Sequence, residues 1–368
     1  MPASDLARRL GLTLPIVQAP MSGGVTTPEL IAAVGEAGGL GSLGAGYMSG
    51  RAIRAAAEAI RRRSSRPFAI SLFAPEPRPQ PADEPALRQA SAALDPYRAE
   101  LGLAPPPPRP PYRQPWREQI EAVMAVRPAA FSFCFGIPDE TVMAALRDRD
   151  VLLIGTATTV AEARLLEDAG VDAIVAQGFE AGGLRGTFTV PYDQAFIGLM
   201  ALLPQVTAAV DLPVVAAGGL MTGQAIAAVL ALGAEAAQLG TAFAACAESG
   251  FGEAQIQALM AAHDEGTALT QAYTGKPARG LRNRFMVEAF DQGLPFVAYP
   301  MQHGLTSDLR RAAVEQDRRD LMAVWAGQGV GAIRRTTAEG LMAALARELQ
   351  ESLAGLGRQA GTWRLRDS

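Results

Sequence analysis

Two neighbouring apolar runs late in the chain end in glycines, a pattern that can bind a phosphate group. One run ends in Gly218-Gly219 and the next ends in Gly240-Thr241. Glycine lets a ligand approach the backbone closely, and the N–H groups that open a following helix attract an anion. Either pair alone would be explained as the end of a strand, but together they predict a phosphate-bearing ligand. The expected contacts are Gly218, Gly219, Gln238, Leu239, Gly240 and Thr241.

A third glycine-rich segment, Gln177–Gly186, holds four glycines in ten residues and is expected to form a loop close to the same ligand. The Gln177 carboxamide can both donate and accept, so it matches the edge of a heterocycle such as a flavin pyrimidine, or it caps the loop backbone. Near the N-terminus, Met21 follows another apolar run. A methionine there lies against a flat ring or fills a gap in the core.

Few side chains are suited to proton transfer or charge attraction. His303 is the best candidate base, because the ordinary histidine pKa of ~6.5 suits proton transfer near neutral pH; a surface or capping role is the alternative. Lys276, the single lysine, lies in a Gly-Lys-Pro turn and is expected at the surface. Arg185 would either attract an anionic substrate or pair with Glu180.

The cysteines and histidines predict neither a metal site nor a disulfide framework. His263 and His303 are 40 residues apart, and Cys134 and Cys246 lie in no CxxC or CxxH spacing. Structural metal ions need ligands at short, characteristic spacings. Both cysteines lie in apolar contexts and are expected to be buried and inert.

The elements that must position these residues are short apolar strands separated by helices. Most of the runs are continuously apolar, as expected of parallel strands that are buried on both faces. Eight such runs with helical crossovers predict an α/β fold, the (β/α)8 or TIM barrel, with a doubly wound open sheet as the alternative. The runs are Pro15–Ala19, Gly39–Leu43, Phe68–Phe73, Ala129–Phe135, Val151–Ala157, Ala173–Gln177, Pro213–Ala217 and Ala236–Gly240.

Two segments interrupt the alternation of strands and helices. Residues 75–115 hold 13 of the 26 prolines and are expected to be extended, solvent-facing and mobile, as a surface insertion after strand three or a lid over the site. Strands are not evident after about residue 241, which predicts a helical C-terminal extension over about 245–368. Residues 1–368 are then expected to form one barrel domain with these additions.

Composition excludes several classes of function. The chain has 33 basic and 37 acidic residues and no basic run, so nucleic acid is not an expected partner. Hydrophobic residues make up 49%, but no uninterrupted run is long enough for a membrane span. The first residues have no apolar segment typical of a secretory signal, so a cytoplasmic protein is expected, with a homodimer left open.

An ordered set of motifs from about residue 12 to residue 350 resembles the nitronate monooxygenases, formerly called 2-nitropropane dioxygenases. The segments are Gln18–Met21, Gly23–Leu30, Ser132–Pro138, Gln177–Gly183, Ala216–Gly219, Gly275–Gly280 and Trp325–Gly329. The resemblance implies a TIM barrel that contains FMN and oxidises alkyl nitronates with O2, without a metal. It also implies that FMN is held by Gln177, Gly182, Gly219 and Gln238–Thr241, with Ala19–Met21 beside the flavin ring.

Three positions depart from the family pattern. The family's glycine-rich loop normally continues Gly-Gly-His-Arg-Gly, and its histidine is the proposed catalytic base; here Leu184 stands at that position. Strand three usually ends Asn-Leu-Phe, with the asparagine near the flavin, whereas this chain has Ser71. His303 stands where the family often has another tyrosine. Leucine cannot transfer a proton, so the catalytic roles at Leu184 and His303 are the altered part of the site.

The sequence therefore predicts an FMN-dependent oxidoreductase with an altered active site, acting on a nitronate or related small anion and O2. A nitronate is already an anion, so its oxidation needs no base. One alternative is an NAD(P)H-dependent FMN reductase of a quinone or enoyl compound. Another is a flavin-binding protein that has lost catalysis, which the missing histidine would favour.

Overall fold

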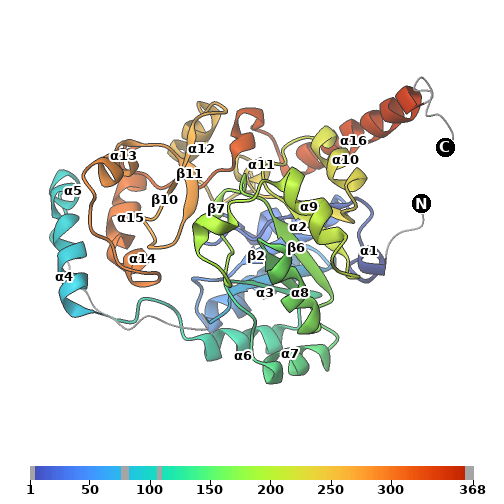
Figure 1. Ribbon diagram of the computed structural model, residues 1–368, viewed down its shortest axis with the longest axis horizontal. Coiled ribbons are helices and arrows are strands. Elements are labelled where there is room, and N and C mark those ends of the chain that lie inside the picture. Colours follow the sequence, from blue (N-terminus) through green and yellow to red (C-terminus); the bar gives the residue numbers. More distant parts are fainter. Residues whose placement is uncertain (1–4, 76–82, 106–109, 361–368) are drawn as a thin grey trace.

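The computed structural model describes residues 5–75, 83–105 and 110–360 (Figure 1). Eight parallel strands form its central sheet in the order β1-β9-β8-β6-β5-β4-β3-β2. Seven of the eight predicted runs contain one of these strands, and the eighth, Gly39–Leu43, overlaps β2. Their bounds are β1 Ile16–Gln18, β2 Gly41–Gly44, β3 Phe68–Phe73, β4 Ala130–Cys134, β5 Leu152–Ala157, β6 Ala173–Gln177, β8 Val214–Ala217 and β9 Ala236–Leu239.

The two ends of this sheet meet, so the strands form a barrel. The Gln18 N–H donates to the Leu40 carbonyl oxygen at 2.9 Å, and the Leu40 N–H donates to the Ile16 carbonyl oxygen at 3.0 Å. These bonds join β1 to the residue that precedes β2. The predicted TIM barrel is confirmed, and the alternative of an open sheet is wrong.

Eight helices of the described chain surround the barrel, one for each strand. Threonines cap three of them as the sequence indicates, because Thr27, Thr159 and Thr222 each accept a hydrogen bond from an N–H three residues on. The helices are α2 Pro28–Glu36, α3 Gly50–Arg63, α6 Trp116–Val126, α7 Glu140–Arg147, α8 Val160–Asp168, α9 Leu199–Thr207, α10 Gly223–Ala231 and α16 Ala338–Ala360. A short helix, α1 Asp5–Arg9, precedes β1.

The eighth helix of the ring is the last helix of the chain. Helix α16 packs between α10 and α2, and its Glu348 carboxylate accepts a hydrogen bond from the Gly223 N–H at 2.8 Å. Residues 240–337 are therefore inserted between the last barrel strand and its helix; they form the second insertion, after the proline-rich one at residues 75–115. The predicted C-terminal extension is in this respect wrong, because its final helix completes the barrel.

The insertion after β9 also contains strands, which the prediction of a helical segment missed. Strands β10 Thr267–Thr270 and β11 Ala278–Leu281 are antiparallel, and β11 pairs with β7 Gly183–Leu184 from the glycine-rich loop. All three are two to four residues long, too short to show a pattern of alternation. The helices of the insertion are α11 Thr241–Ala244, α12 Glu253–Met260, α13 Arg284–Asp291, α14 Met301–Leu305 and α15 Ser307–Glu315.

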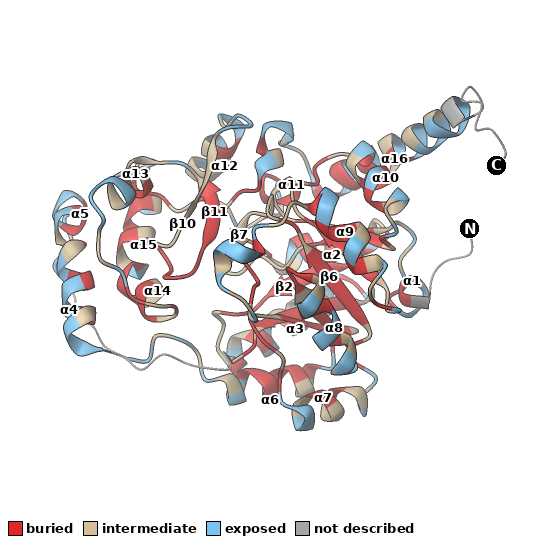
Figure 2. Ribbon diagram, viewed as in Figure 1, coloured by how far each residue is buried: buried red, intermediate tan, exposed pale blue. Residues whose placement is uncertain are grey.

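The described part of the proline-rich segment contains two helices, which corrects the prediction of extended chain, whereas its mobility stays a prediction. It forms α4 Glu84–Ala93 and α5 Asp95–Glu100, and each of these helices has its proline in the first turn, where no backbone N–H is needed. The apolar faces of both helices are buried against the insertion that follows β9 (Figures 1 and 2). Residues 76–82 and 106–109 lie outside the described residues.

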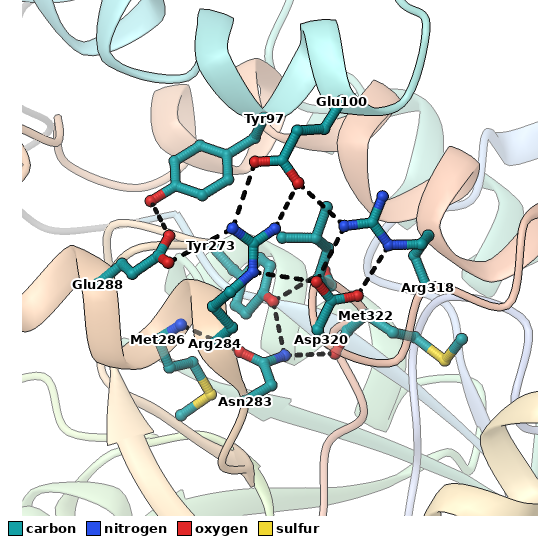
Figure 3. A network of polar contacts seen from close by, with 11 residues as sticks. Tyr97, Glu100, Tyr273, Asn283, Arg284, Met286, Glu288, Arg318, Asp320 and Met322 are labelled. Atoms are coloured by element: carbon teal, nitrogen blue, oxygen red, sulfur yellow. Dashed lines mark hydrogen bonds and ion pairs between the residues drawn. The ribbon is translucent and has the colours of Figure 1, made fainter.

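Ion pairs fix α5 to the second insertion (Figure 3). Arg284 and Arg318 both contact the Glu100 carboxylate, and both also contact Asp320 at 2.9–3.0 Å. The fully buried Arg98 donates to Asp308 of α15 at 2.9 Å. The two insertions thus form a second hydrophobic cluster beside the barrel. That the whole chain folds as one domain stays a prediction.

None of the helices in the described ranges combines the length and the apolar character that a membrane crossing would require.

Candidate active site

A cavity of about 1300 Å³, including its open mouth, lies at the carboxyl ends of the barrel strands. This end of the barrel is where TIM-barrel enzymes carry their active sites. Seven of the barrel strands contribute residues to the cavity lining or do so through the loop that follows them, and β2 contributes only through its following loop. The second insertion covers the cavity. The lining includes Met21, Tyr47, Ser71, Phe73, Cys134, Thr156, Gln177, Gly182, Leu184, Gly218, Gly219, Gln238, Gly240, Thr241 and Trp325.

The structure brings the predicted site residues together, with two exceptions. Nine of the ten residues predicted to contact the cofactor line the cavity, as does Leu184. Leu239 is the exception among the ten, because its side chain is buried in the barrel core. His303 does not line the cavity either.

The glycines after β8 and β9 present backbone to the cavity. Gly218 and Gly219 have φ angles of 130° and 69°, a region that side chains other than glycine rarely adopt. At Gly240 an added Cβ would meet nothing closer than Ala19 at 3.6 Å, so its main chain borders open space. The helix that follows, α11, has only four residues, so individual N–H groups rather than a helix dipole would contact an anion.

Gln177 performs the capping role that the sequence left open. Its Oε1 accepts from the Gly186 N–H at 2.8 Å, and its Nε2 donates to the Leu184 carbonyl oxygen at 3.1 Å. The Gln177 Oε1 also accepts from the Arg185 Nη1 at 3.5 Å, but Nε2 keeps a second N–H that can still face a ligand. Gln177 therefore fixes the glycine-rich loop and lines the cavity at once.

A second set of contacts fixes the continuation of this loop, and sequence analysis missed it. The buried Glu162 carboxylate accepts from the N–H groups of Phe188 at 2.7 Å and Thr189 at 3.1 Å, and from the Thr158 hydroxyl at 2.6 Å. Arg185 is also buried and donates to the Ala195 carbonyl oxygen. Glu180 is used elsewhere, because it caps the first N–H of α9 at 2.9 Å, and attraction of an anionic substrate by Arg185, which does not line the cavity, stays a prediction.

The segment Trp325–Gly329 covers the cavity, and it lies more than 80 residues beyond β9, the last strand of the barrel. The Gly327 N–H donates to the Thr241 hydroxyl at 2.9 Å, and the Gln328 N–H donates to the Glu180 carbonyl oxygen at 2.9 Å. A Cβ on Gly182 would lie 2.6 Å from the Gly327 nitrogen. The resemblance to the family included this segment, but no sequence signal placed it over the cavity.

No side chain that lines the cavity, within the described chain, changes its protonation near neutral pH. Its titratable members are Tyr47 and Cys134. Burial raises the pKa of the Tyr47 phenol to about 12, against the opposing influence of Arg310. Burial also raises the pKa of the Cys134 thiol to about 12. Both groups are therefore protonated at pH 7, and Leu184 adds only apolar surface.

His303 lies behind Tyr47 rather than in the cavity. The two rings are stacked with centroids 4.1 Å apart and planes 10° apart, and the Arg310 Nη2 lies 3.1 Å from the His303 Nδ1. Burial and the Arg310 charge lower the pKa of His303 to about 2. The ordinary pKa expected for His303 is therefore wrong, and the imidazole is neutral at physiological pH.

Lys276 is buried, which corrects its predicted place at the surface. Its Nζ lies 4.5 Å from the ring centroid of Phe135, which lines the cavity, and 5.4 and 5.8 Å from those of Tyr192 and Tyr299. Aromatic ring faces attract a cation, so the three rings hold the ammonium group. They come from separate segments, and only the fold brings them together.

Comparison with known proteins agrees with this architecture. The model of the family described as nitronate monooxygenase matches residues 6–348. A probable nitronate monooxygenase of Staphylococcus aureus strain MRSA252 is 38% identical over 324 residues, which cover 88% of this chain and 90% of that protein.

Solved structures show the same fold over nearly the whole chain. A nitroalkane oxidase from Streptomyces ansochromogenes is 43% identical, with a TM-score of 0.89, and the match covers 95% of this chain and 99% of that one. FabK from Thermotoga maritima is 26% identical, with a TM-score of 0.77 and coverage of 98% and 100%. From its sequence and fold together, the chain belongs to the nitronate monooxygenase family.

Proposed function

We propose that this protein is an FMN-dependent enzyme that oxidises alkyl nitronates with O2. Family membership and the likeness to a nitroalkane oxidase support oxidation of a nitronate. The single observation that most narrows the chemistry is a cavity whose described lining has no group suited to remove a proton near neutral pH. A nitronate is already ionised, so this cavity suits the nitronate better than the neutral nitroalkane.

The residues of the cavity fit FMN. Backbone N–H groups around Gly219 and Gly240 would hold its phosphate, because these glycines leave the main chain open to the cavity. The carboxamides of Gln177 and Gln238 would pair with the polar edge of the ring, and Met21 would lie against its face. FMN held by these residues would supply the redox chemistry by which a nitronate and O2 react, with one oxygen atom of O2 entering the carbonyl product and nitrite leaving.

The protein's own part is to hold the substrate and keep water out. Phe73, Phe135 and Trp325 line the cavity with aromatic surface. Such a lining excludes water and strengthens each polar contact inside. The Tyr47 hydroxyl is protonated and can donate a hydrogen bond to a nitronate oxygen.

Two measurements test this proposal. The cofactor released from the purified protein by acid should have the mass of FMN. Oxygen consumption with ethyl nitronate should then greatly exceed that with nitroethane at pH 7, before nitroethane ionises. A protein that co-purifies without FMN, or that consumes no oxygen with any nitronate, would refute it.

The reductase alternative keeps one supporting observation. Leu184 removes the family's proposed base, and a reductase that receives hydride from NAD(P)H does not need one there. Rapid anaerobic reduction of the bound flavin by NADPH would favour this function. Rapid reduction of the flavin by NADPH, together with no activity on any nitronate, would establish the reductase function.

A further inference from the structure

Three side chains contact one another in a row that leads from the cavity into the second insertion. Tyr47 lines the cavity, and the His303 ring is stacked on it with 4.1 Å between ring centroids. Arg310 follows, with its Nη2 within 3.3 Å of both His303 ring nitrogens. None of these contacts is needed to complete the barrel, because His303 and Arg310 belong to α14 and α15.

Arg310 brings a positive charge that forms no ion pair within the described chain, and Asp308 acts on that charge only through space. Its guanidinium donates to the His303 carbonyl oxygen at 2.9 Å and to the Thr306 hydroxyl at 3.2 Å, both of them neutral acceptors. The nearest carboxylate in sequence, Asp308, is bound by the buried Arg98 at 2.9 Å. An arginine stays protonated under all ordinary conditions, so its charge acts on whatever occupies the cavity.

Burial strengthens this effect. Desolvation lowers the pKa of Arg310, and the Arg310 charge in turn opposes the rise in the pKa of Tyr47. The charge is therefore close enough to the Tyr47 hydroxyl to stabilise negative charge there. The same interaction would stabilise an anion that accepts a hydrogen bond from that hydroxyl.

We propose that Arg310 supplies a positive charge that helps to hold an anionic substrate in the cavity, in addition to the Lys276 charge beside Phe135, with Tyr47 as the residue that contacts the anion and His303 as a neutral spacer between Tyr47 and Arg310. This inference rests on the proposed function for its substrate, a nitronate, and names the residues that select for its charge. Arg310 and His303 are positioning residues in this account, because neither lines the cavity.

His303 suits a spacer and not a base, because its ring does not line the cavity and burial makes the imidazole a poor proton acceptor. A protonated imidazole would lie 3.1 Å from a guanidinium nitrogen, and two positive charges at that distance repel each other. A flat ring that packs between Tyr47 and Arg310 is what the position requires. His303→Phe should therefore keep nitronate turnover, whereas His303→Ala should reduce it by leaving Tyr47 unsupported.

The test compares a charged and a neutral probe that cannot react. Propionate is a planar anion of about the size of ethyl nitronate, and propionamide is its neutral counterpart. Dissociation constants for both are measured by calorimetry on the flavin-loaded protein. A unit charge about 10 Å from an anion, at an effective dielectric constant of about 20, changes the dissociation constant by roughly 10- to 20-fold.

Arg310→Met should therefore weaken propionate binding by about 10- to 20-fold and change propionamide binding by less than about 3-fold. Arg310→Lys should restore most of the affinity for propionate. The matched control is Arg311→Met, because Arg311 is the next residue of the same helix and its exposed side chain faces Glu315 at 3.9 Å. The control should bind both probes as the wild type does.

Equal propionate binding by wild type and Arg310→Met would overturn the proposal, as would equal losses for both probes or no propionate binding by the wild type. If Arg310→Met does not fold, Arg310→Gln decides, because it keeps a polar side chain, removes the charge, and should weaken propionate binding more than propionamide binding. Loss of nitronate turnover in His303→Phe would contradict the spacer role. Arg310-dependent binding of propionate by a protein that oxidises no nitronate would refute the proposed function and leave the anion site intact.

Discussion

Leu184→His should give the protein activity on neutral nitroalkanes. Leu184 lies on β7, where it pairs with Ala278, and its side chain lines the cavity at the position of the family's proposed base. It is only partly buried, so an imidazole there should have a pKa close to the ordinary value of ~6.5. At pH 8 roughly 97% of such an imidazole would be neutral and able to accept a proton.

The size of the gain follows from what a positioned base contributes. General base catalysis is worth about 10²- to 10⁴-fold in rate, so kcat/KM for nitroethane should rise by that factor. Ethyl nitronate needs no base, and its kcat/KM should stay within about 3-fold. The gain should grow as pH rises through ~6.5, because only the neutral imidazole accepts the proton.

Initial rates of oxygen consumption at several pH values measure both substrates. Leu184→Asn is the matched control, since it places a polar side chain of similar size at this position without a base. A variant that keeps its flavin and its nitronate turnover but gains nothing on nitroethane would refute the reasoning. So would a wild type that turns over nitroethane as fast as the nitronate and loses this activity in His303→Ala.

Three further predictions concern the cofactor site, the insertion and His303. Gly240→Val should fold but lose flavin absorbance, since an added Cβ meets no atom within 3.4 Å and the side chain would fill the cavity. Arg98→Met should lower the free energy of unfolding, measured by denaturant titration, by about 3 kcal/mol, because it leaves Asp308 without its buried partner. The control Arg88→Met, which breaks an exposed pair with Glu84, should change this free energy by less than about 0.5 kcal/mol. His303→Phe should make the protein less sensitive to unfolding by acid. The pKa of His303 is lowered to about 2 in the folded chain, so the unfolded wild type binds one more proton between pH ~6.5 and pH 2, and the free energy of unfolding decreases as the pH is lowered through that window. An unchanged acid transition in the variant would contradict the burial of this ring.

The barrel was predictable because its strands are buried on both faces, and continuous apolar runs such as Ala173–Gln177 have no other common explanation. The number of strands favoured a closed barrel over an open sheet, but the hydrogen bonds between β1 and Leu40 that close it leave no sequence pattern. The proline-rich segment was misinterpreted because Pro85 and Pro96 lie in first turns, where proline favours a helix. Proline content alone does not reveal such positions.

Some residues of the candidate site could likewise be predicted from the sequence, and others could not. Glycines such as Gly219 and Gly240 were predictable because their signal is local, at the end of a strand. Tyr47, Arg310 and the cover at Trp325–Gly329 were not, because tertiary structure alone brings them to the cavity. Lys276 shows the same limit, since a turn sequence predicts exposure but three distant rings enclose its ammonium group.

Anaerobic mixing of the purified, flavin-loaded protein with ethyl nitronate tests the central claim most directly. The absorbance of the oxidised flavin should fall rapidly with the nitronate, return when O2 is admitted, and stay unchanged when NADPH replaces the nitronate. Rapid loss of that absorbance with NADPH and none with ethyl nitronate would contradict the account.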